Sequence, residues 1–143
     1  MEITRRIVFH AGHMLKDDTS KCYHPHGHEY VLECTLEGNV QSKGASTGMV
    51  LNFGDLKADM MRLVHDVVDH KFIIEYNDPR FINFVDAVGE DGVHIVKFAP
   101  TAENLVRYFY VILSPSLRQR GVKISKLRLQ ETYQCWVEYD GND

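Results

Sequence analysis

The side chains that could carry out chemistry gather near the start of the chain, in the segments FHAGH (9–13) and CYHPHGH (22–28). If the second segment enters a β-strand, His26 and His28 point to one side, because residues two apart in a strand share a face. His13, on a neighbouring strand, would complete a set of three imidazoles. Three protein ligands leave one position of a tetrahedral zinc ion open, as catalytic zinc sites do. The spacing therefore predicts a zinc centre at His13, His26 and His28.

Other side chains in the same window compete for these roles. His10 lies on the same predicted strand as His13, and His24 shares the strand parity of His26. A single His-x-His pair is also frequent in exposed strands that bind no metal. Cys22 could be a fourth ligand, which would give a closed structural site. Its position on a predicted loop, four residues before His26, favours instead a reactive thiol that approaches a bound substrate.

Further along the chain, an Asp-His pair, a glutamate and two cysteines stand out. Asp69 could orient His70 and raise its basicity, although the pair alone is more simply explained as a helix end followed by a surface histidine. Glu131 ends a predicted strand, where it is either an exposed acid or an acceptor for two adjacent N–H groups of an amino-pyrimidine ring. Cys34 and Cys135 fall on core-facing strand positions and are interpreted as small buried hydrophobic residues.

Four segments are predicted to be β-strands from their apolar-polar alternation and their β-branched residues. They are 3–10, 26–37, 122–131 and 133–139. The last two follow each other so closely that a tight turn must join them.

Two further segments carry apolar residues at the three- and four-residue spacing of an amphipathic helix. One is predicted from Asn52 or Asp55 to about Asp69, and the other from the N-cap Thr101 to just before Pro115. Between them, residues 77–100 hold turn signals around two short apolar runs, the second of which could form a small hairpin arm.

The order strand, strand, helix, helix, strand, strand predicts an α+β fold with a four-stranded antiparallel sheet and two helices on one face. We expect one domain over 1–143, because single cores of about 100 to 150 residues are common. Such a sheet has two open edges, which are an aggregation hazard unless another subunit pairs with them. We therefore predict an oligomer built by edge-to-edge pairing.

The composition argues against several functional classes. Lys and Arg total 16 against 20 Asp and Glu, a formal net charge of −4, so no basic surface for nucleic acid is indicated. No apolar run approaches the roughly 18 residues of a membrane span, and the first residues lack the apolar core of a signal peptide. The 3 cysteines cannot all pair within one chain, which favours a reducing, cytosolic setting.

Taken together, the motifs resemble those of the family of 6-pyruvoyl-tetrahydropterin synthases and 6-carboxytetrahydropterin synthases. The resemblance covers essentially the whole chain and rests on FHAGH, Cys-x-x-x-His-Gly-His, VLNFGDLK (50–57), DHK (69–71), PTAEN (100–104) and QET (130–132). It implies the tunnelling fold, in which three subunits join their sheets into a barrel and two such trimers stack into a hexamer. That assembly would close both open edges of the sheet.

The resemblance also implies a role for each candidate residue. His13, His26 and His28 would bind zinc, and Cys22 would be the general base. Asp69 and His70 would assist proton transfer, Glu131 would anchor the pterin ring, and Thr101 would lie in the pterin pocket. The implied substrate is 7,8-dihydroneopterin triphosphate. Its negative charge needs a basic lip, for which the unranked candidates are Lys16, Lys21, Arg5 and Arg6.

The spacing between Cys22 and His-Gly-His indicates the branch of the family. Three residues separate Cys22 from His26. This spacing resembles that of the bacterial carboxy type, whereas the mammalian pyruvoyl type has a longer spacing. The resemblance thus implies a 6-carboxy-5,6,7,8-tetrahydropterin synthase of the queuosine pathway, which releases acetaldehyde and triphosphate. The pyruvoyl reaction on the same substrate and a non-catalytic zinc-stabilised interaction domain are the alternatives. The arm 77–100 is longer than in compact bacterial members and could alter the pocket rim.

Overall fold

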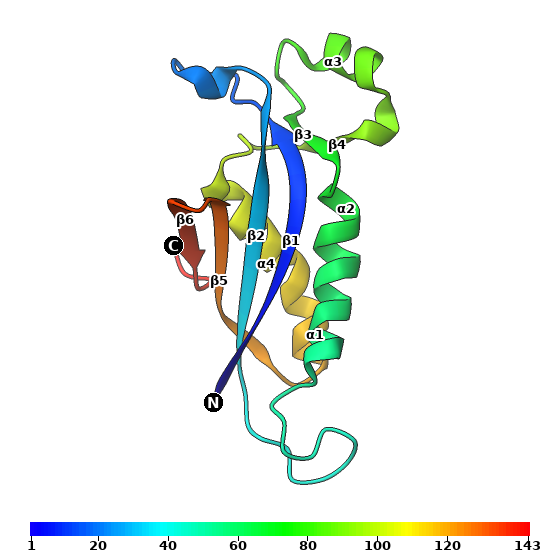
Figure 1. Ribbon diagram of the computed structural model, residues 1–143, viewed down its shortest axis with the longest axis vertical. Helices are drawn as coiled ribbons and strands as arrows, with labels where there is room; N and C mark the ends of the chain where they lie inside the picture. Colours follow the sequence, from blue (N-terminus) through cyan, green and yellow to red (C-terminus); the bar gives the residue numbers. More distant parts are fainter.

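Six β-strands form one sheet, with the order β4-β3-β1-β2-β5-β6 from edge to edge (Figure 1). The computed structural model describes residues 1–143 throughout. The strands are β1 (Glu2–His13), β2 (His26–Glu37), β3 (Lys71–Glu75), β4 (Val93–Val96), β5 (Lys123–Thr132) and β6 (Cys135–Tyr139). Neighbours among β1, β2, β5 and β6 pair antiparallel, whereas β3 and β4 run parallel to β1. The sheet is therefore mixed.

The helices pack on one face of the sheet, and the other face stays open (Figure 1). They are α1 (Phe53–Met60), a π-helical turn (Met61–His65), α2 (Asp66–Val68), α3 (Phe81–Val88) and α4 (Ala102–Gln119). The first three follow one another without a break, and α3 stands apart in the arm. None of these helices combines the length and apolar character that crossing a membrane would require.

The core lies between the helices and the face of the sheet that β1 and β2 turn toward them. Alternation buries Phe9 and Ala11 on β1, and Tyr30 and Leu32 on β2. These two strands pair over their whole length, from Glu2 opposite Glu37 to His13 opposite His26. Because residues that pair directly in an antiparallel ladder share a face, the register decides which side chains can meet at the end of the two strands.

The prediction of an α+β fold is confirmed, but the four-stranded antiparallel sheet is wrong in both strand number and direction. The two additional strands, β3 and β4, have only 5 and 4 residues. Runs this short do not show the alternation by which a strand is recognised in a sequence. The segment 93–98 was expected to form a small hairpin, but its first residues instead pair with β3, and the segment 81–88 is the helix α3.

The two long helices begin where they were expected to begin. Asn52, rather than Asp55, caps α1 by accepting a hydrogen bond from the Gly54 N–H. Thr101 caps α4 in the same way, through the Asn104 N–H. The expected end of α4 before Pro115 is wrong, because the helix continues to Gln119. Proline costs the helix one hydrogen bond, but Leu113 and Leu117 are fully buried on either side of it and offset that loss.

The two cysteines assigned to the core have different environments. Cys34 is fully buried on β2, as expected, and burial raises the pKa of its thiol to about 12. Cys135 is exposed, so its assignment to the core is wrong. It begins the edge strand β6, which has a neighbouring strand on one side only.

A buried carboxylate, Asp59, ties α1 to α4. It accepts hydrogen bonds from Arg120 Nε at 2.8 Å and from the Ser116 hydroxyl at 2.9 Å. The hydrogen bonds from Arg120, opposed by burial and helped by Ser116, hold the pKa of Asp59 below its ordinary value. Because the pKa falls on folding, the ionised form stabilises the fold above a pH of about 4, and this contribution is lost as the pH falls through the lower, folded pKa.

Replacing Asp59 by asparagine should therefore lower the free energy of unfolding at pH 7 by about 2 kcal/mol, since the Arg120 hydrogen bonds lose their charged acceptor. Urea unfolding at pH 7 and again near pH 3 measures this, and the difference from the unsubstituted chain should shrink at the lower pH. The matched control is Asp66→Asn, in which the side chain is 64% exposed and little change is expected. A difference that does not depend on pH would contradict this account of Asp59.

Candidate active site

Three histidines and one glutamate meet at the end of β1 and β2. One ligand atom from each of His13, His26, His28 and Glu131 lies within 4.8 Å of all the others. The register explains the meeting: His13 pairs with His26, and His28 pairs with Ala11, so the three imidazoles share the core face. Glu131 reaches them from the end of β5, the neighbour of β2.

Hydrogen bonds to the backbone fix two of these rings. His13 Nδ1 lies 2.7 Å from the Pro100 carbonyl oxygen, and His26 Nδ1 lies 2.7 Å from the His24 carbonyl oxygen. Since a carbonyl oxygen can only accept, each Nδ1 carries the proton and donates it. Each Nε2 therefore keeps its lone pair and is available to a metal, the arrangement that orients histidine ligands in metalloproteins.

The third ring, that of His28, has a buried nitrogen, Nε2, without a hydrogen-bond partner. Glu131 Oε1 approaches it to 2.8 Å, but this contact lacks the alignment of a hydrogen bond. Buried polar atoms without a partner are rare in folded proteins and call for an explanation, of which a metal ion is one.

Burial favours the neutral form of His13 and His28, and neutral imidazole is the form that binds metal. Burial lowers the pKa of His13 to about 4, against the opposing effect of the Pro100 hydrogen bond. Burial also lowers the pKa of His28, although the nearby Glu131 opposes this change. Burial, together with Glu131, raises the pKa of Tyr30, whose hydroxyl lies 3.4 Å from His13 Nδ1. The site thus combines two rings that favour the neutral form with a buried phenol and one carboxylate, Glu131, which is 25% exposed.

This donor set fits zinc. Three imidazole nitrogens and a carboxylate oxygen are ligands that zinc commonly takes in tetrahedral sites. The competing histidines lie outside the group: His10 is on the opposite face of β1, and His24 contributes only its carbonyl oxygen. Cys22 is also outside it. Glu131, expected to bind the pterin ring, also lies among the candidate metal ligands, and its contact with the pterin stays a prediction.

Cys22 lies in the connection 14–25, which leaves β1 directly after His13 and enters β2 at His26. It is half-buried in a short 3-10 turn (Lys21–Tyr23). Ser20 caps this turn through the Cys22 N–H, and the Cys22 carbonyl accepts a hydrogen bond from the Leu15 N–H at 2.9 Å. The thiol is thus held on a folded segment whose two ends are the strands that carry the histidines.

The motifs PTAEN and QET meet beside the histidine cluster. Thr101 directly follows Pro100, whose carbonyl orients His13. Glu103 at the start of α4 and Glu131 on β5 line a hollow of about 180 Å³, together with Trp136 on β6. A carboxylate and an aromatic side chain around a small hollow suit a flat ring that donates hydrogen bonds from its edge.

Asp69 and His70 lie on the other face of the sheet. Asp69 accepts hydrogen bonds from the His10 N–H and from His70 Nδ1, both at 2.8 Å. His70 has a φ of +59°, a left-handed conformation that is uncommon for residues other than glycine and costs free energy. Its backbone N–H is held by the His10 carbonyl at 2.7 Å. The surroundings thus hold His70 in a defined conformation beside β1, and its part in proton transfer stays a prediction.

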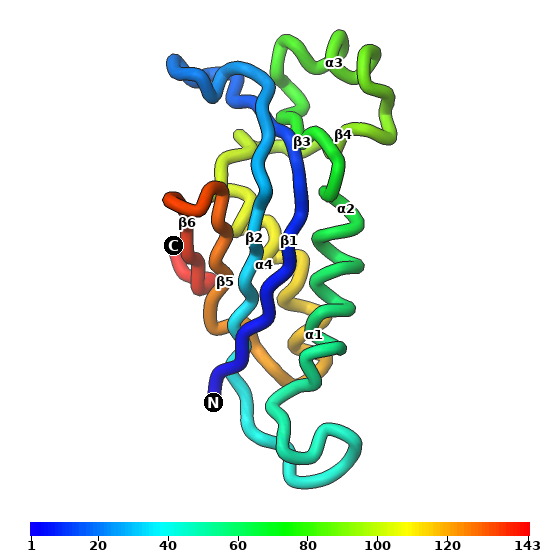
Figure 2. Tube along the Cα trace, viewed as in Figure 1, coloured from blue at the N-terminus to red at the C-terminus, as the bar shows by residue number.

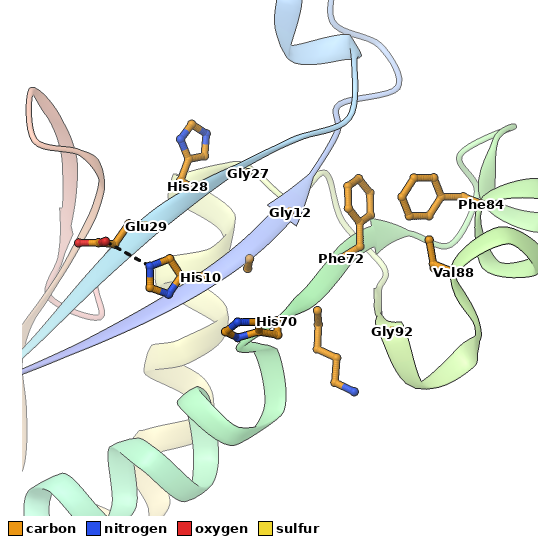
Figure 3. Close-up of a pocket in the computed structure, with 12 residues that line it drawn as sticks. His10, Gly12, Gly27, His28, Glu29, His70, Phe72, Phe84, Val88 and Gly92 are labelled. Carbon is orange, nitrogen blue, oxygen red and sulfur yellow. Dashed lines mark hydrogen bonds and ion pairs between the residues drawn. The ribbon is translucent and has the colours of Figure 1, made fainter.

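A second hollow, of about 640 Å³, lies on this open face and includes His10, His70 and Phe72 in its wall. Figure 3 shows the His28 ring turned away from His10, Glu29 and His70. Strand alternation explains this, because His28 and Glu29 are neighbours and must point to opposite faces. His28 lines the same hollow as His70, but within one chain its ring and those of His13 and His26 are grouped on the core face, apart from the His70 ring.

The four basic residues that were candidates for binding the triphosphate lie at two different ends of the sheet. Lys16 and Lys21 lie in the connection that carries Cys22. Arg5 and Arg6 are toward the other end of β1, roughly 25 Å from His13 at 3.3 Å per residue. Arg6 is paired with Glu33 as well. Only the two lysines lie at the same end of the chain's sheet as the candidate site.

Sequence reasoning missed the groups that orient the rings. The carbonyls of Pro100 and His24 leave no mark in a sequence, because every residue has one. The proximity of Glu131 to His28 was also missed, although the QET motif gave its position. The pairing of β5 with β2, which places the two side by side, depends on tertiary structure.

Comparisons with known proteins show which family the chain is similar to. The family model described as 6-pyruvoyl tetrahydropterin synthase matches residues 2–142. A 6-carboxy-5,6,7,8-tetrahydropterin synthase of Aquifex aeolicus is 32% identical, covering 96% of both chains. A 6-pyruvoyl tetrahydrobiopterin synthase of Dictyostelium discoideum is 30% identical, covering 97% of this chain and 95% of the relative.

Solved structures show the same fold. An uncharacterised protein of Wolinella succinogenes superimposes with a TM-score of 0.84 at 23% identity, covering 99% of this chain and 98% of that one. The 6-pyruvoyl tetrahydropterin synthase of Caenorhabditis elegans gives 0.69 at 26% identity, covering 99% and 96%. The named relatives that match nearly the whole chain are pterin synthases, which defines the class of protein. The chain belongs to the 6-pyruvoyl tetrahydropterin synthase family.

Proposed function

We propose that the protein is a zinc-dependent 6-carboxy-5,6,7,8-tetrahydropterin synthase, which converts 7,8-dihydroneopterin triphosphate and water to 6-carboxytetrahydropterin, acetaldehyde and triphosphate. The observation that carries this proposal is the cluster of His13, His26 and His28, in which backbone hydrogen bonds leave the Nε2 lone pairs of His13 and His26 free. The half-buried Cys22 lies in the connection between the two strands that carry these histidines. Relatives at 32% and 31% identity that bear this name support the carboxy branch.

Each residue has a distinct task in this proposal. The three histidines hold zinc, which supplies Lewis acidity toward the hydroxyl groups of the substrate side chain. Glu131 accepts the two adjacent N–H groups of the pterin ring, and Thr101 lies beside it. Cys22, as its thiolate, removes a carbon-bound proton from the side chain. Lys16 and Lys21 attract the triphosphate.

Asp69 and His70 lie across the sheet from the histidine cluster of their own chain, so an oligomer would be needed to complete the catalytic site. If these residues assist proton transfer, they must serve the histidine cluster of another copy of the chain, because their own cluster lies across the sheet. The edge strands β4 and β6 offer unpaired backbone groups for such an assembly. We propose the hexamer of two stacked trimers, which light scattering can test.

Mixed oligomers provide a functional test of this sharing. Cys22→Ala and His70→Ala should each be inactive alone, since each lacks one half of every site. After the two variants are unfolded together and refolded, some sites combine an intact Cys22 with an intact His70 from different copies. Turnover should then recover to about a quarter of the unsubstituted level, as random mixing of two chains gives. No recovery from chains that have demonstrably mixed would contradict a shared site.

The role of Glu131 can be separated from metal binding. Glu131→Gln should keep the metal, because three histidines remain, but should weaken substrate binding by about 2 kcal/mol or more through loss of a charge-assisted contact. Metal content and the Michaelis constant are measured on the same preparation. An unchanged Michaelis constant would exclude the pterin contact, and loss of metal would make Glu131 a fourth ligand. Glu29→Gln, one residue from His28 but on the open face, is the matched control.

The identity of the products decides between the proposed reaction and its alternatives. The zinc-loaded protein is incubated with dihydroneopterin triphosphate, and the pterin and any aldehyde are identified by mass spectrometry. Acetaldehyde together with 6-carboxytetrahydropterin supports the proposal. A pyruvoyl pterin without acetaldehyde identifies the other branch. Absence of turnover by a metal-loaded oligomer would favour the non-catalytic interaction domain.

A further inference from the structure

An arginine in the arm holds the connection that carries Cys22. The Arg80 guanidinium stacks over the Tyr23 ring, with its central carbon 4.0 Å from the ring centroid. Its Nη1 also donates to the Tyr23 carbonyl oxygen. We call Asp78, Arg80 and Tyr23 the Arg80 clamp. Figure 2 shows the two segments that it joins, the connection 14–25 and the arm, projecting from the same end of the sheet.

Asp78 anchors the clamp in the protein. Its carboxylate is 1% exposed and accepts two parallel hydrogen bonds from Arg80, Nε to Oδ1 at 2.9 Å and Nη2 to Oδ2 at 2.8 Å. The Arg80 N–H donates to Oδ1 as well, at 2.9 Å. Burying a carboxylate is costly unless such contacts satisfy it. With Nε and Nη2 on Asp78, the remaining Nη1 is aimed at Tyr23.

The contacts of Arg80 with Tyr23 also restrain the residues on either side of Tyr23. Cys22 precedes it within the 3-10 turn, whose only other tertiary hydrogen bond is from the Leu15 N–H to the Cys22 carbonyl. His24 follows it and accepts the hydrogen bond that orients His26. Tyr23 itself remains 39% exposed, so little burial holds this segment in place. The Arg80 clamp is thus the contact that ties the Cys22 turn to a rigid, buried group.

We propose that Arg80 is a positioning residue, which fixes the Cys22 thiol relative to the three histidines by holding Tyr23 against the arm. This inference rests on the proposed function, in which Cys22 takes the proton. This inference also gives the arm (77–100) a role in the reaction, because the arm contains Asp78 and Arg80, which hold the connection 14–25. Arg80 touches neither the reacting atoms nor the metal ligands, so its effect passes through Tyr23.

The test uses the three cysteines of the zinc-loaded protein as separate reporters. Iodoacetamide labelling is followed for each cysteine-containing peptide by mass spectrometry. Cys34 is fully buried and should stay unlabelled in any folded variant, whereas Cys135 is exposed and calibrates the reagent. The rate at Cys22 relative to Cys135 then reports how firmly the connection is held. This ratio does not depend on turnover, and kcat and KM are measured in parallel.

Arg80→Ala should raise the labelling ratio of Cys22 by about threefold or more, because the half-buried turn opens more often. It should also lower kcat by about tenfold or more with a smaller change in KM, since misplacement of a reacting group acts mainly on the chemical step. Arg80→Lys should recover part of both effects, because lysine keeps the charge but not the planar fork.

Two further variants make the result decisive. Arg80→Ala leaves Asp78 buried and unpaired, so the double variant Asp78→Asn with Arg80→Gln removes the clamp without leaving a lone charge. Arg107→Ala is the matched control, because Arg107 also lies over a tyrosine, Tyr139, and pairs with a carboxylate, Asp143, away from Cys22. It should change neither the labelling ratio nor kcat.

Three outcomes would overturn the proposal. They are a Cys22 labelling ratio in both clamp variants no greater than in Arg107→Ala, a raised ratio with an unchanged kcat, and a kcat loss that accompanies labelling of Cys34. Failure of the proposed function looks different: the unsubstituted, zinc-loaded protein would then not turn over dihydroneopterin triphosphate, or Cys22→Ala would keep full turnover. In that case the labelling ratio still decides whether Arg80 holds the connection.

Discussion

Replacing His28 by alanine should release the metal from the protein. The three imidazoles are the principal donors that the structure gathers, and His28 Nε2 is a buried atom with no hydrogen-bond partner of its own. Removing a group that merely orients a ligand costs roughly 10- to 100-fold in metal affinity, so loss of a ligand should exceed about 100-fold. Zinc content after dialysis, and competition with a chelator of known affinity, measure the loss.

His24→Ala and His10→Ala are the controls for this result. His24 acts only through its backbone carbonyl, which alanine retains, and His10 lies on the opposite face of β1. Both variants should keep zinc. Loss of zinc from His24→Ala with retention by His28→Ala would show that the alternation along β2 identifies the wrong pair.

Replacing Cys22 by alanine should abolish turnover while the metal stays bound. The thiol is outside the group of candidate ligands, so the three histidines keep their geometry. A positioned general base contributes about 10²- to 10⁴-fold to a rate, and a fall in kcat of about 10³-fold or more is expected. Turnover and zinc content are measured on the same sample.

The same substitution distinguishes a catalytic from a structural site. If zinc leaves together with activity, Cys22 is a ligand and the site is closed. Cys135→Ala provides the control, because that thiol is exposed on β6, beside the hollow that contains Glu131. It should retain both zinc and most of the turnover, and a large loss of kcat would give Cys135 a role that the proposal lacks.

The histidine cluster could be predicted because it depends on local geometry. The period of two along a strand placed His26 and His28 on one face, and the structure adds His13 through the register of β1 with β2. Their role as zinc ligands stays a prediction. The caps at Asn52 and Thr101 were predictable for the same reason, since a cap is decided by its own residue and the next turn.

Features that depend on distant parts of the chain could not be predicted in this way. β3 and β4 are strands because they find a place beside β1, and their own residues give little sign of it. The position of Asp69 and His70 beside β1 follows from the hydrogen bonds of both residues to the His10 backbone, 59 and 60 positions earlier by residue number. The Arg80 clamp joins residues 57 positions apart. The tunnelling fold and the hexamer remain predictions.

The two faces of β1 have a consequence for mixed populations of the protein. One face carries His13, and the other holds Asp69 and His70 through the backbone of His10, so each chain would contribute to two centres in the proposed assembly. A chain defective in one of these groups disables one centre, and activity then falls in proportion to its abundance. A chain defective in both also disables the centre of a healthy neighbour. Activity then follows the square of the healthy fraction, which is the behaviour of a dominant-negative allele.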